Sequence, residues 1–215
     1  MSTSQGPGDP LTAPVARVSN LNIANQLTIL RLLLMPVFAV ALLWDGGEST
    51  GWRIAAFVIF ATASWTDRID GQLARSRGLV TSFGKLADPI ADKALIGTAL
   101  IGLSLLDLLP WWVTVIVVVR EVGVTLLRFW VIRHGVIPAS RGGKLKTLLQ
   151  GLAIGLYVLP LSGALATGRA GVMIAAVAVT VVTGVDYVAR ALTLRQTSER
   201  AAMKRARKAD SERRG

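Results

Sequence analysis

Six long apolar stretches constrain this chain more than any other feature of its sequence. They cover residues 27–44, 52–66, 85–106, 110–133, 145–162 and 171–193, the second continuing as helix through Ala74. Several approach or exceed the length of about 20 residues that an α-helix needs to cross a hydrocarbon core of about 30 Å. None alternates apolar and polar residues over about 10 positions, as transmembrane β-strands do. Glycines recur in them, as close helix packing in lipid requires, at Gly97, Gly102, Gly151, Gly155 and Gly184. The pattern predicts an all-α integral membrane protein with six transmembrane helices.

The composition agrees with this prediction and limits the chemistry. Of the 215 residues, 52% are hydrophobic and only 17% are charged, whereas soluble domains carry about 25% charged residues. The chain has no cysteine and a single histidine, His134, which excludes disulfides, thiolate metal sites and clusters of several histidines. Carboxylates, basic groups and hydroxyls must therefore carry any reaction.

The distribution of Lys and Arg predicts the orientation in the membrane. With both termini inside, the inner segments contain 18 Lys and Arg residues and the outer loops contain two, Arg53 and Arg169. The inner segments are 1–26, 67–85, 133–146 and the chain from Arg190 onward. Because positive residues concentrate in cytoplasmic loops, we expect an N-in/C-in topology.

The two ends of the chain differ from the apolar middle. Residues 1–20 are rich in Pro, Gly and Ser and lack an apolar region followed by a cleavage site, so we expect a disordered head and not a signal peptide. Residues 194–215 form a basic tail after the membrane domain 21–193. The tail could bind anionic lipid or simply set the topology; without aromatic residues for stacking, it is not expected to bind nucleic acid.

Four aspartates stand where the second and third apolar stretches meet the inner side. Asp67 and Asp70 are three residues apart, and Asp88 and Asp92 are four apart, so each pair shares one face of a helix. Four carboxylates at one place need cationic neutralisation, and Mg²⁺ or Mn²⁺ suits an oxygen-only ligand set. Two such ions would serve a displacement at phosphorus.

Other roles remain open for these residues. The acids could form a proton relay, a cation path, or ion pairs with Arg75, Lys85 and Lys93. Gly71 and Ala74 leave room for a ligand against the helix, and Arg75 offers a fork for a phosphate, but small residues also serve helix packing alone.

The same stretch resembles a known family. Its fixed residues are Asp67-x2-Asp70-Gly71-x2-Ala74-Arg75-x8-Gly84-x3-Asp88-x3-Asp92. They match every fixed position in the signature of the CDP-alcohol phosphatidyltransferases. The resemblance implies a six-helix membrane fold, two divalent metal ions and attack of an alcohol on the β-phosphorus of a CDP-linked donor. It also implies an active site facing the cytoplasm, a bacterial plasma membrane location and a homodimer.

The resemblance also implies roles for individual residues. Metal would be bound by Asp67, Asp70 and Asp88, and Asp92 would approach the second ion and act as general base on the acceptor hydroxyl. The cytidine diphosphate end of the donor would be held by Gly71, Ala74, Arg75 and Thr81. Asn25 and Thr28 are further candidates for contacts with the cytidine or with metal-bound water, although helix capping explains Asn25 equally well.

Three further patches resemble the branch of the family that forms phosphatidylglycerophosphate from glycerol 3-phosphate. They are Asn22-x2-Asn25-x2-Thr28-x2-Arg31-x4-Pro36, the pair Arg120-Glu121, and Gly143-Lys144-x-Lys146-Thr147-x2-Gln150. The candidate residues for the acceptor phosphate are Arg120, Arg141, Lys144 and Lys146, the last three in one cytoplasmic loop. Arg120 could instead pair with Glu121 or a signature aspartate, and basic loop residues also satisfy the orientation rule without a ligand.

The sequence thus predicts transfer of a phosphatidyl group from CDP-diacylglycerol to sn-glycerol 3-phosphate. Two alternatives keep the chemistry but use another acceptor, inositol phosphate or, in cardiolipin synthesis, phosphatidylglycerol. A divalent-cation channel or transporter is the alternative of a different class; it would spread its acids along a pore, whereas these lie at one end of two segments.

Overall fold

The computed structural model describes the backbone of residues 23–76, 82–131 and 141–214, and the side chains of residues 26–66, 90–128, 130 and 142–196. Within these ranges the chain forms helices and no strand. The helices are α1 (Ile23–Leu43), the short 3-10 helix η2 (Trp44–Gly47), α2 (Thr50–Ser76), α3 (Ser82–Leu105), α4 (Trp111–Val131), α5 (Arg141–Val158) and α6 (Gly163–Arg214). The all-α prediction is therefore confirmed over the described residues, with one long helix for each apolar stretch.

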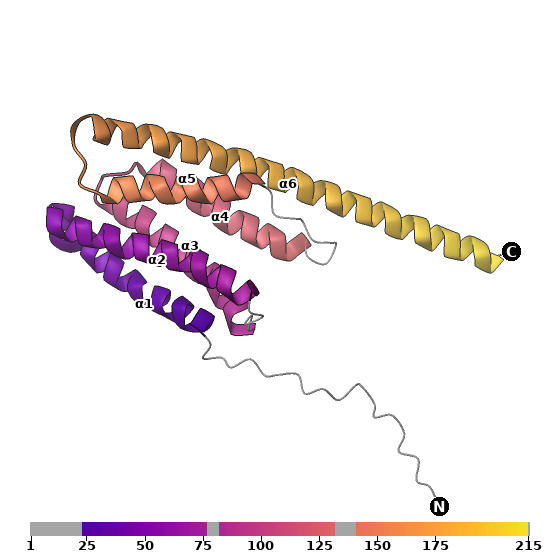
Figure 1. Ribbon diagram of the computed structural model, residues 1–215. Helices are drawn as coiled ribbons and strands as arrows, with labels where there is room; N and C mark the ends of the chain where they lie inside the picture. The colour runs from indigo at the N-terminus through magenta and orange to yellow at the C-terminus, as the bar shows by residue number, and fades with distance from the viewer. Residues whose placement is uncertain (1–22, 77–81, 132–140, 215) are drawn as a thin grey trace, which may run out of the picture.

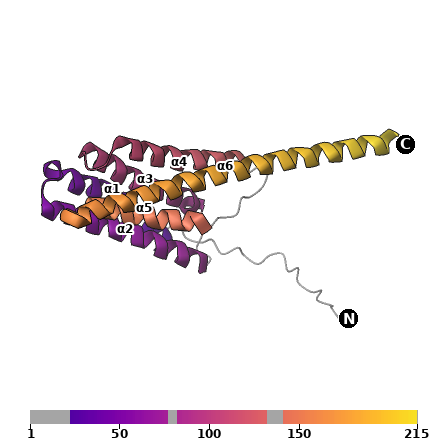
Figure 2. The same cartoon turned by 90° about the horizontal axis from the view of Figure 1, so that it is seen from above.

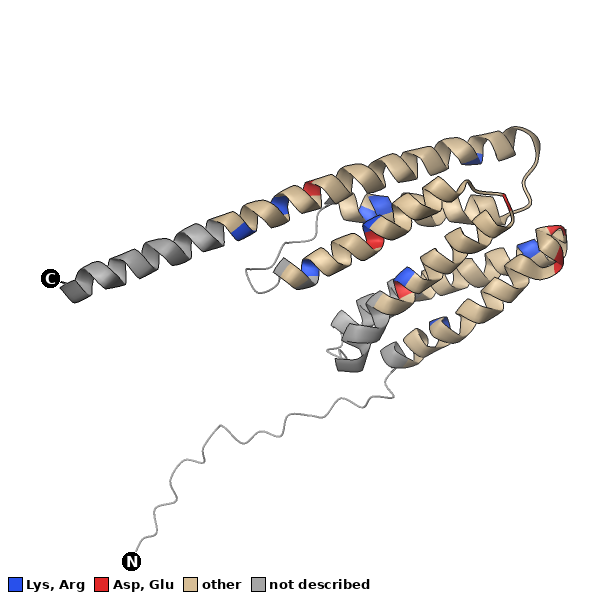
Figure 3. Ribbon diagram, turned by 180° about the vertical axis from the view of Figure 1, so that it is seen from behind, with Lys and Arg blue, Asp and Glu red and all other residues tan. Residues whose placement is uncertain are grey.

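Among the described residues, two regions meet the length and composition of a membrane span by themselves, Gln26–Gly47 and Gly163–Gln196. Many large apolar side chains on all six long helices are exposed, as a surface in contact with lipid would be. Figure 3 shows long stretches of helix without Lys, Arg, Asp or Glu, and charged residues gathered at a few places along the bundle. Six spans and their orientation remain predictions.

The long helices pack around one apolar core (Figures 1 and 2). The helix α1 lies against α2 and α3, whereas α6 lies against α4 and α5. The two groups are joined through α3, which contacts α4 and α5, and through the contact between α2 and α5. Residues from all six long helices form the core, among them Phe38, Phe60, Leu100, Val117, Ile154 and Met173. This arrangement brings one face each of α3, α4 and α5 together.

Three of the five glycines predicted to allow close packing do so. A Cβ atom at Gly102 would lie 2.8 Å from Leu42 Cδ2, and one at Gly155 would lie 3.2 Å from Phe57 Cε2. Gly184 packs on the side chain of Arg120. The prediction was wrong for Gly97 and Gly151, where an added Cβ would meet no described atom within 4 Å, because helical periodicity does not tell which face meets a neighbour.

The last helix is longer than its apolar stretch. Instead of ending near residue 193, α6 continues to Arg214. Residues 185–214 contain neither Gly nor Pro, and Ala, Arg, Lys and Glu are good helix formers. The basic segment therefore prolongs the helix beyond the bundle (Figure 1).

Arg53, near the start of α2, joins this helix to the end of α5. It is 9% exposed. Its Nε donates to the carbonyl of Val158 (3.0 Å), and its Nη2 donates to those of Tyr157 (2.7 Å) and Leu159 (3.1 Å). The last carbonyls of a helix lack intrahelical partners, so Arg53 provides a donor for the buried carbonyls of Tyr157 and Val158, whereas that of Leu159 also accepts from the Leu161 N–H.

Candidate active site

The signature aspartates lie on two neighbouring helices. Asp67 and Asp70 belong to α2, and Asp88 and Asp92 belong to α3. The backbone is helical at all four positions, and α2 contacts α3. The predicted pairs thus have the helical spacing that puts each on one face, and a donor set made only of carboxylates fits Mg²⁺ or Mn²⁺.

Only Asp92 among the four has a described side chain. The side chains of Asp67, Asp70 and Asp88 lie outside the described residues, as do those of the predicted donor-binding residues Asn25, Gly71, Ala74, Arg75 and Thr81. Among the residues that are described, no group of three or more His, Cys, Asp and Glu could hold a metal ion. Three of the four signature aspartates are not among those residues.

A pocket opens beside Asp92, between α3, α4 and α5. It is lined by Asp92, Lys93 and Ile96 of α3, Glu121 of α4, and Lys146, Thr147 and Gln150 of α5. The predicted general base therefore shares a pocket with two amino groups. Gln150 is 3% exposed, and its Oε1 atom has no hydrogen-bond partner among the described residues.

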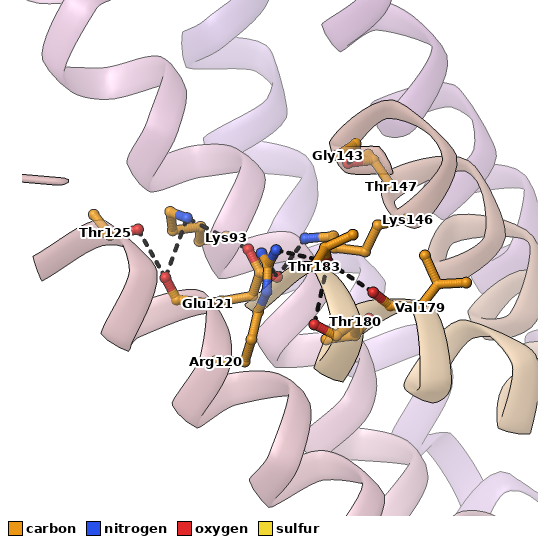
Figure 4. A network of polar contacts seen from close by, with 10 residues as sticks. All are labelled: Lys93, Arg120, Glu121, Thr125, Gly143, Lys146, Thr147, Val179, Thr180 and Thr183. Carbon is orange, nitrogen blue, oxygen red and sulfur yellow. Dashed lines mark hydrogen bonds and ion pairs between the residues drawn. The ribbon is translucent and has the colours of Figure 1, made fainter. Parts of the chain in front are cut away.

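One carboxylate in this pocket is shared by three cationic side chains (Figure 4). Glu121 Oε1 accepts hydrogen bonds from Arg120 Nη1 (3.1 Å) and from Lys146 Nζ, and its Oε2 lies 3.5 Å from Lys93 Nζ. We call Lys93, Arg120, Glu121 and Lys146 the Glu121 hub. Because one negative charge faces three positive ones, the hub keeps an excess of positive charge in a largely apolar bundle, where charge is costly unless it is compensated. An anion that enters the pocket would compensate this excess positive charge.

Arg120 pairs with Glu121, as one of the alternatives from the sequence had it. It does not line the pocket but lies behind Glu121 on α4, and its Nη2 donates to Thr183 Oγ1 on α6 at 3.0 Å. Arg120 therefore does not contact the pocket itself but binds Glu121, which lines it. A separate ion pair lies on α6, where Arg190 Nε is 2.9 Å from Asp186 Oδ2 one helical turn away.

The structure separates the other basic residues expected at the acceptor phosphate. Lys146 lines the pocket and its side chain is 8% exposed. Lys144 is exposed and does not line it. The side chain of Arg141 is outside the described residues. The prediction that the three share a loop was wrong, because α5 begins at Arg141 and includes them all.

Thr28 and Arg31 on α1 are both 1% exposed. Buried polar side chains of this kind are expected to be engaged in interactions, and both make them. Asn25 lies in the first turn of α1, two residues after its start.

Three residues of the site were given no binding role from the sequence: Lys93 was considered only as an ion-pair partner of the aspartates, Gln150 appeared only within a pattern, and Thr183 was not named. Lys93 and Gln150 line the pocket, and Thr183 holds Arg120. A carboxylate beside an arginine in an apolar run, Arg120-Glu121, was the only local signal that a buried charged cluster forms here. Nothing local marks Thr183, because its partner is 63 positions away.

Comparisons with known proteins point to one family. The sequence model of the family described as CDP-alcohol phosphatidyltransferase matches residues 21–182. A relative from Mycobacterium tuberculosis (strain H37Rv), named probable phosphatidylglycerophosphate synthase, is 59% identical over 194 residues, which cover 88% of this chain and 93% of the relative.

Two more distant relatives have related names. The CDP-diacylglycerol–glycerol-3-phosphate 3-phosphatidyltransferase of Bacillus subtilis (strain 168) is 39% identical over 148 residues, 64% of this chain and 77% of the relative. A cardiolipin synthase (CMP-forming) from Streptomyces coelicolor is 35% identical over 121 residues, 55% of each chain. The first name states CDP-diacylglycerol and glycerol 3-phosphate, and the second states that CMP is formed.

Proposed function

Because the chain belongs to the CDP-alcohol phosphatidyltransferase family, we propose that it transfers a phosphatidyl group from CDP-diacylglycerol to sn-glycerol 3-phosphate and releases CMP. The names of the relatives support glycerol 3-phosphate as the acceptor, and the observation that carries a phosphorylated acceptor is the pocket in which Asp92 lies beside Lys93 and Lys146. A phosphorylated alcohol needs both a base for its hydroxyl and positive charge for its phosphate. This pocket offers both.

The proposed reaction is one displacement at phosphorus. The acceptor hydroxyl oxygen forms a bond to the β-phosphorus of the donor, the bond from that phosphorus to the CMP oxygen breaks, and the hydroxyl proton passes to Asp92. A hydroxyl has a pKa far above 7, so a carboxylate within hydrogen-bond reach is needed to accept the proton as the new bond forms. Asp92 is the one signature aspartate whose side chain is described, and it lines the pocket.

Asp67, Asp70, Asp88 and Asp92 would hold two Mg²⁺ or Mn²⁺ ions. Bound there, such ions stabilise negative charge on the phosphoryl and leaving oxygens. The residues proposed to hold the cytidine diphosphate end of the donor are Asn25, Thr28, Gly71, Ala74, Arg75 and Thr81. Arg75 suits this role because a guanidinium group can form paired hydrogen bonds with phosphate oxygens.

We propose that Lys146, together with Lys93, binds the acceptor phosphate directly. Arg120 contributes its charge through Glu121, and Arg141 and Lys144, in the first turn of α5, would attract the anion toward the pocket. Gln150 Oε1 has no hydrogen-bond partner among the described residues, so it can accept a hydrogen bond from a hydroxyl group of glycerol 3-phosphate.

We further infer that the protein lies in a bacterial plasma membrane with six spans and both termini in the cytoplasm. The 18 basic residues of the inner segments against two on the outside support this orientation. The pocket would then open to the cytoplasmic side, where a water-soluble acceptor meets a donor whose acyl chains remain in the bilayer. The basic segment 194–214 would lie close to anionic lipid head groups.

A transfer assay tests the proposal. Purified protein in detergent is given CDP-diacylglycerol, Mn²⁺ and radiolabelled glycerol 3-phosphate, and label is measured in the lipid fraction. We expect label in the lipid with glycerol 3-phosphate and much less with inositol phosphate or phosphatidylglycerol, since the last has no terminal phosphate dianion for the lysines. Preferential use of either competitor would contradict the acceptor assignment, and no use of the CDP-linked donor would contradict the reaction itself.

A further inference from the structure

Two residues of α6 support Arg120 of the Glu121 hub. Thr183 accepts a hydrogen bond from its Nη2 atom, and Gly184 packs against its aliphatic stem. We propose that Thr183 and Gly184 are positioning residues for the acceptor pocket. They hold Arg120 against Glu121 and thereby keep Lys93 and Lys146 in place beside Asp92. This inference rests on the proposed function and concerns binding of its phosphorylated acceptor.

Thr183 presents its hydroxyl oxygen to Arg120 as an acceptor. The hydroxyl lies 2.7 Å from the carbonyl of Val179 and 3.2 Å from that of Thr180, both on the preceding turn of α6. Its single proton is therefore used within the helix, as threonines in helices commonly do. The oxygen remains free to accept from Arg120 Nη2 at 3.0 Å (Figure 4), so the helix itself aims the acceptor at the arginine.

Gly184 allows the stem of Arg120 to lie directly on the backbone of α6. An added Cβ would be 3.1 Å from Arg120 Cγ and 3.5 Å from Nε. The Nε atom is buried and has no hydrogen-bond partner among the described residues. Arg120 is therefore fixed by contact along its stem and by hydrogen bonds at the two Nη atoms, one to α6 and one to Glu121.

The position of Arg120 determines where the two pocket lysines lie. Glu121 Oε1 accepts from both Arg120 and Lys146, and Oε2 faces Lys93. If Arg120 moves, the carboxylate loses one of its fixed partners and can rotate, and both amino groups must follow it or lose their bond. A displacement of Arg120 by a few tenths of an ångström at α6 would therefore also displace the Nζ atoms of Lys93 and Lys146, which are proposed to bind the phosphate.

The chain supplies matched control variants on the same helix. Thr180 precedes Thr183 by one turn, and its buried Oγ1 has no hydrogen-bond partner among the described residues, so T180V makes the same chemical change without loss of a bond. Gly171 has no described atom within 4 Å of an added Cβ, so G171A makes the same gain in helix propensity as G184A without touching Arg120.

The test is steady-state kinetics with both substrates varied. T183V and G184A should raise the KM for glycerol 3-phosphate about 3- to 10-fold, as expected for an indirect loss of a charge-assisted hydrogen bond. The kcat should stay within about 2-fold and the KM for CDP-diacylglycerol should not change. T183S, which keeps the hydroxyl, should restore the wild-type KM, and T180V and G171A should match the wild type. A purely structural role for Thr183 would lower the yield of folded protein without changing one KM selectively.

A second measurement does not depend on turnover. Calorimetric titration of glycerol 3-phosphate into the purified protein should show weaker binding to T183V than to T180V, by the same factor as the KM. Equal affinity in the two variants would overturn the positioning role, even if the wild type is an active transferase. Absence of transfer by the wild type would instead contradict the proposed function, and the titration would still decide on Thr183.

Discussion

Two buried cationic sites join distant helices in this protein, and they are satisfied in opposite ways. Arg53 uses its guanidinium group on three backbone carbonyls at the end of α5. In the Glu121 hub, three cationic side chains share one carboxylate. Helix-end carbonyls are fixed, carry partial negative charge and cannot leave, whereas side chains can exchange partners. The first arrangement suits stability, and the second suits binding of an anion.

The comparison predicts that substitutions at the two sites affect different measurements. Changes in the pocket beside the hub should alter kinetic constants and leave the fold largely intact. Changes at Arg53 should lower stability and leave the kinetic constants of the folded fraction unchanged.

The largest effect is expected at Asp92. D92N keeps the size of the side chain but removes the proton acceptor, so kcat should fall by about 10²- to 10⁴-fold. Transfer of label to lipid measures the loss, and thermal unfolding in detergent shows whether the fold is kept. Wild-type kcat in D92N would mean that the proton leaves by another route.

The second-largest effect is expected at Lys146 of the Glu121 hub. K146M retains the apolar stem but removes the amino group from the pocket. The KM for glycerol 3-phosphate should rise about 10- to 100-fold, since a hydrogen bond to a charged group contributes roughly 1.5–3 kcal/mol. K144M is the matched control, since Lys144 is exposed on the same turn of α5 and does not line the pocket. Equal effects of the two variants would show that general positive charge, and not this pocket, attracts the acceptor.

At the other site we expect a loss of stability alone. R53M removes the side-chain donor from the carbonyls of Tyr157 and Val158, while that of Leu159 still accepts from the Leu161 N–H. The loss should cost about 1–3 kcal/mol, or a fall in Tm of about 2–4 °C for each kcal/mol in a chain of this size. R190M removes an exposed pair worth about 0.3–0.5 kcal/mol and provides the control. A changed KM for glycerol 3-phosphate in R53M would show that Arg53 also affects substrate binding and that the two sites do not differ in function.

The smallest effect is expected at Gln150. Q150L removes a buried oxygen that has no partner among the described residues, so the fold should not lose stability. If the amide binds an acceptor hydroxyl, the KM for glycerol 3-phosphate should rise about 3- to 10-fold, as for one lost neutral hydrogen bond. An unchanged KM would assign Gln150 to the pocket wall alone.

Much of the fold and part of the site follow from local sequence. The apolar stretches predicted the helices because backbone hydrogen bonds and apolar surface are satisfied over neighbouring residues. The first stretch, for example, was expected at 27–44 and the helix α1 covers Ile23–Leu43. The aspartate signature identified the family and marked Asp92, which lines the pocket. Spacing alone could not distinguish Lys144 from Lys146, although only the second is buried.

What the sequence by itself determined is the all-helical class, the family and the residue types available for chemistry. All three depend on periodicity, composition and a local motif. Only the tertiary structure decided that Lys93, Arg120 and Lys146 meet at Glu121, and that Thr183 and Gly184 support them. Apart from the adjacent pair Arg120 and Glu121, these contacts join residues that are 25 or more positions apart. They lie on faces of α3, α4, α5 and α6 that become neighbours only when the helices pack. Which faces meet depends on how all six long helices fill one core, and no single helix contains that information.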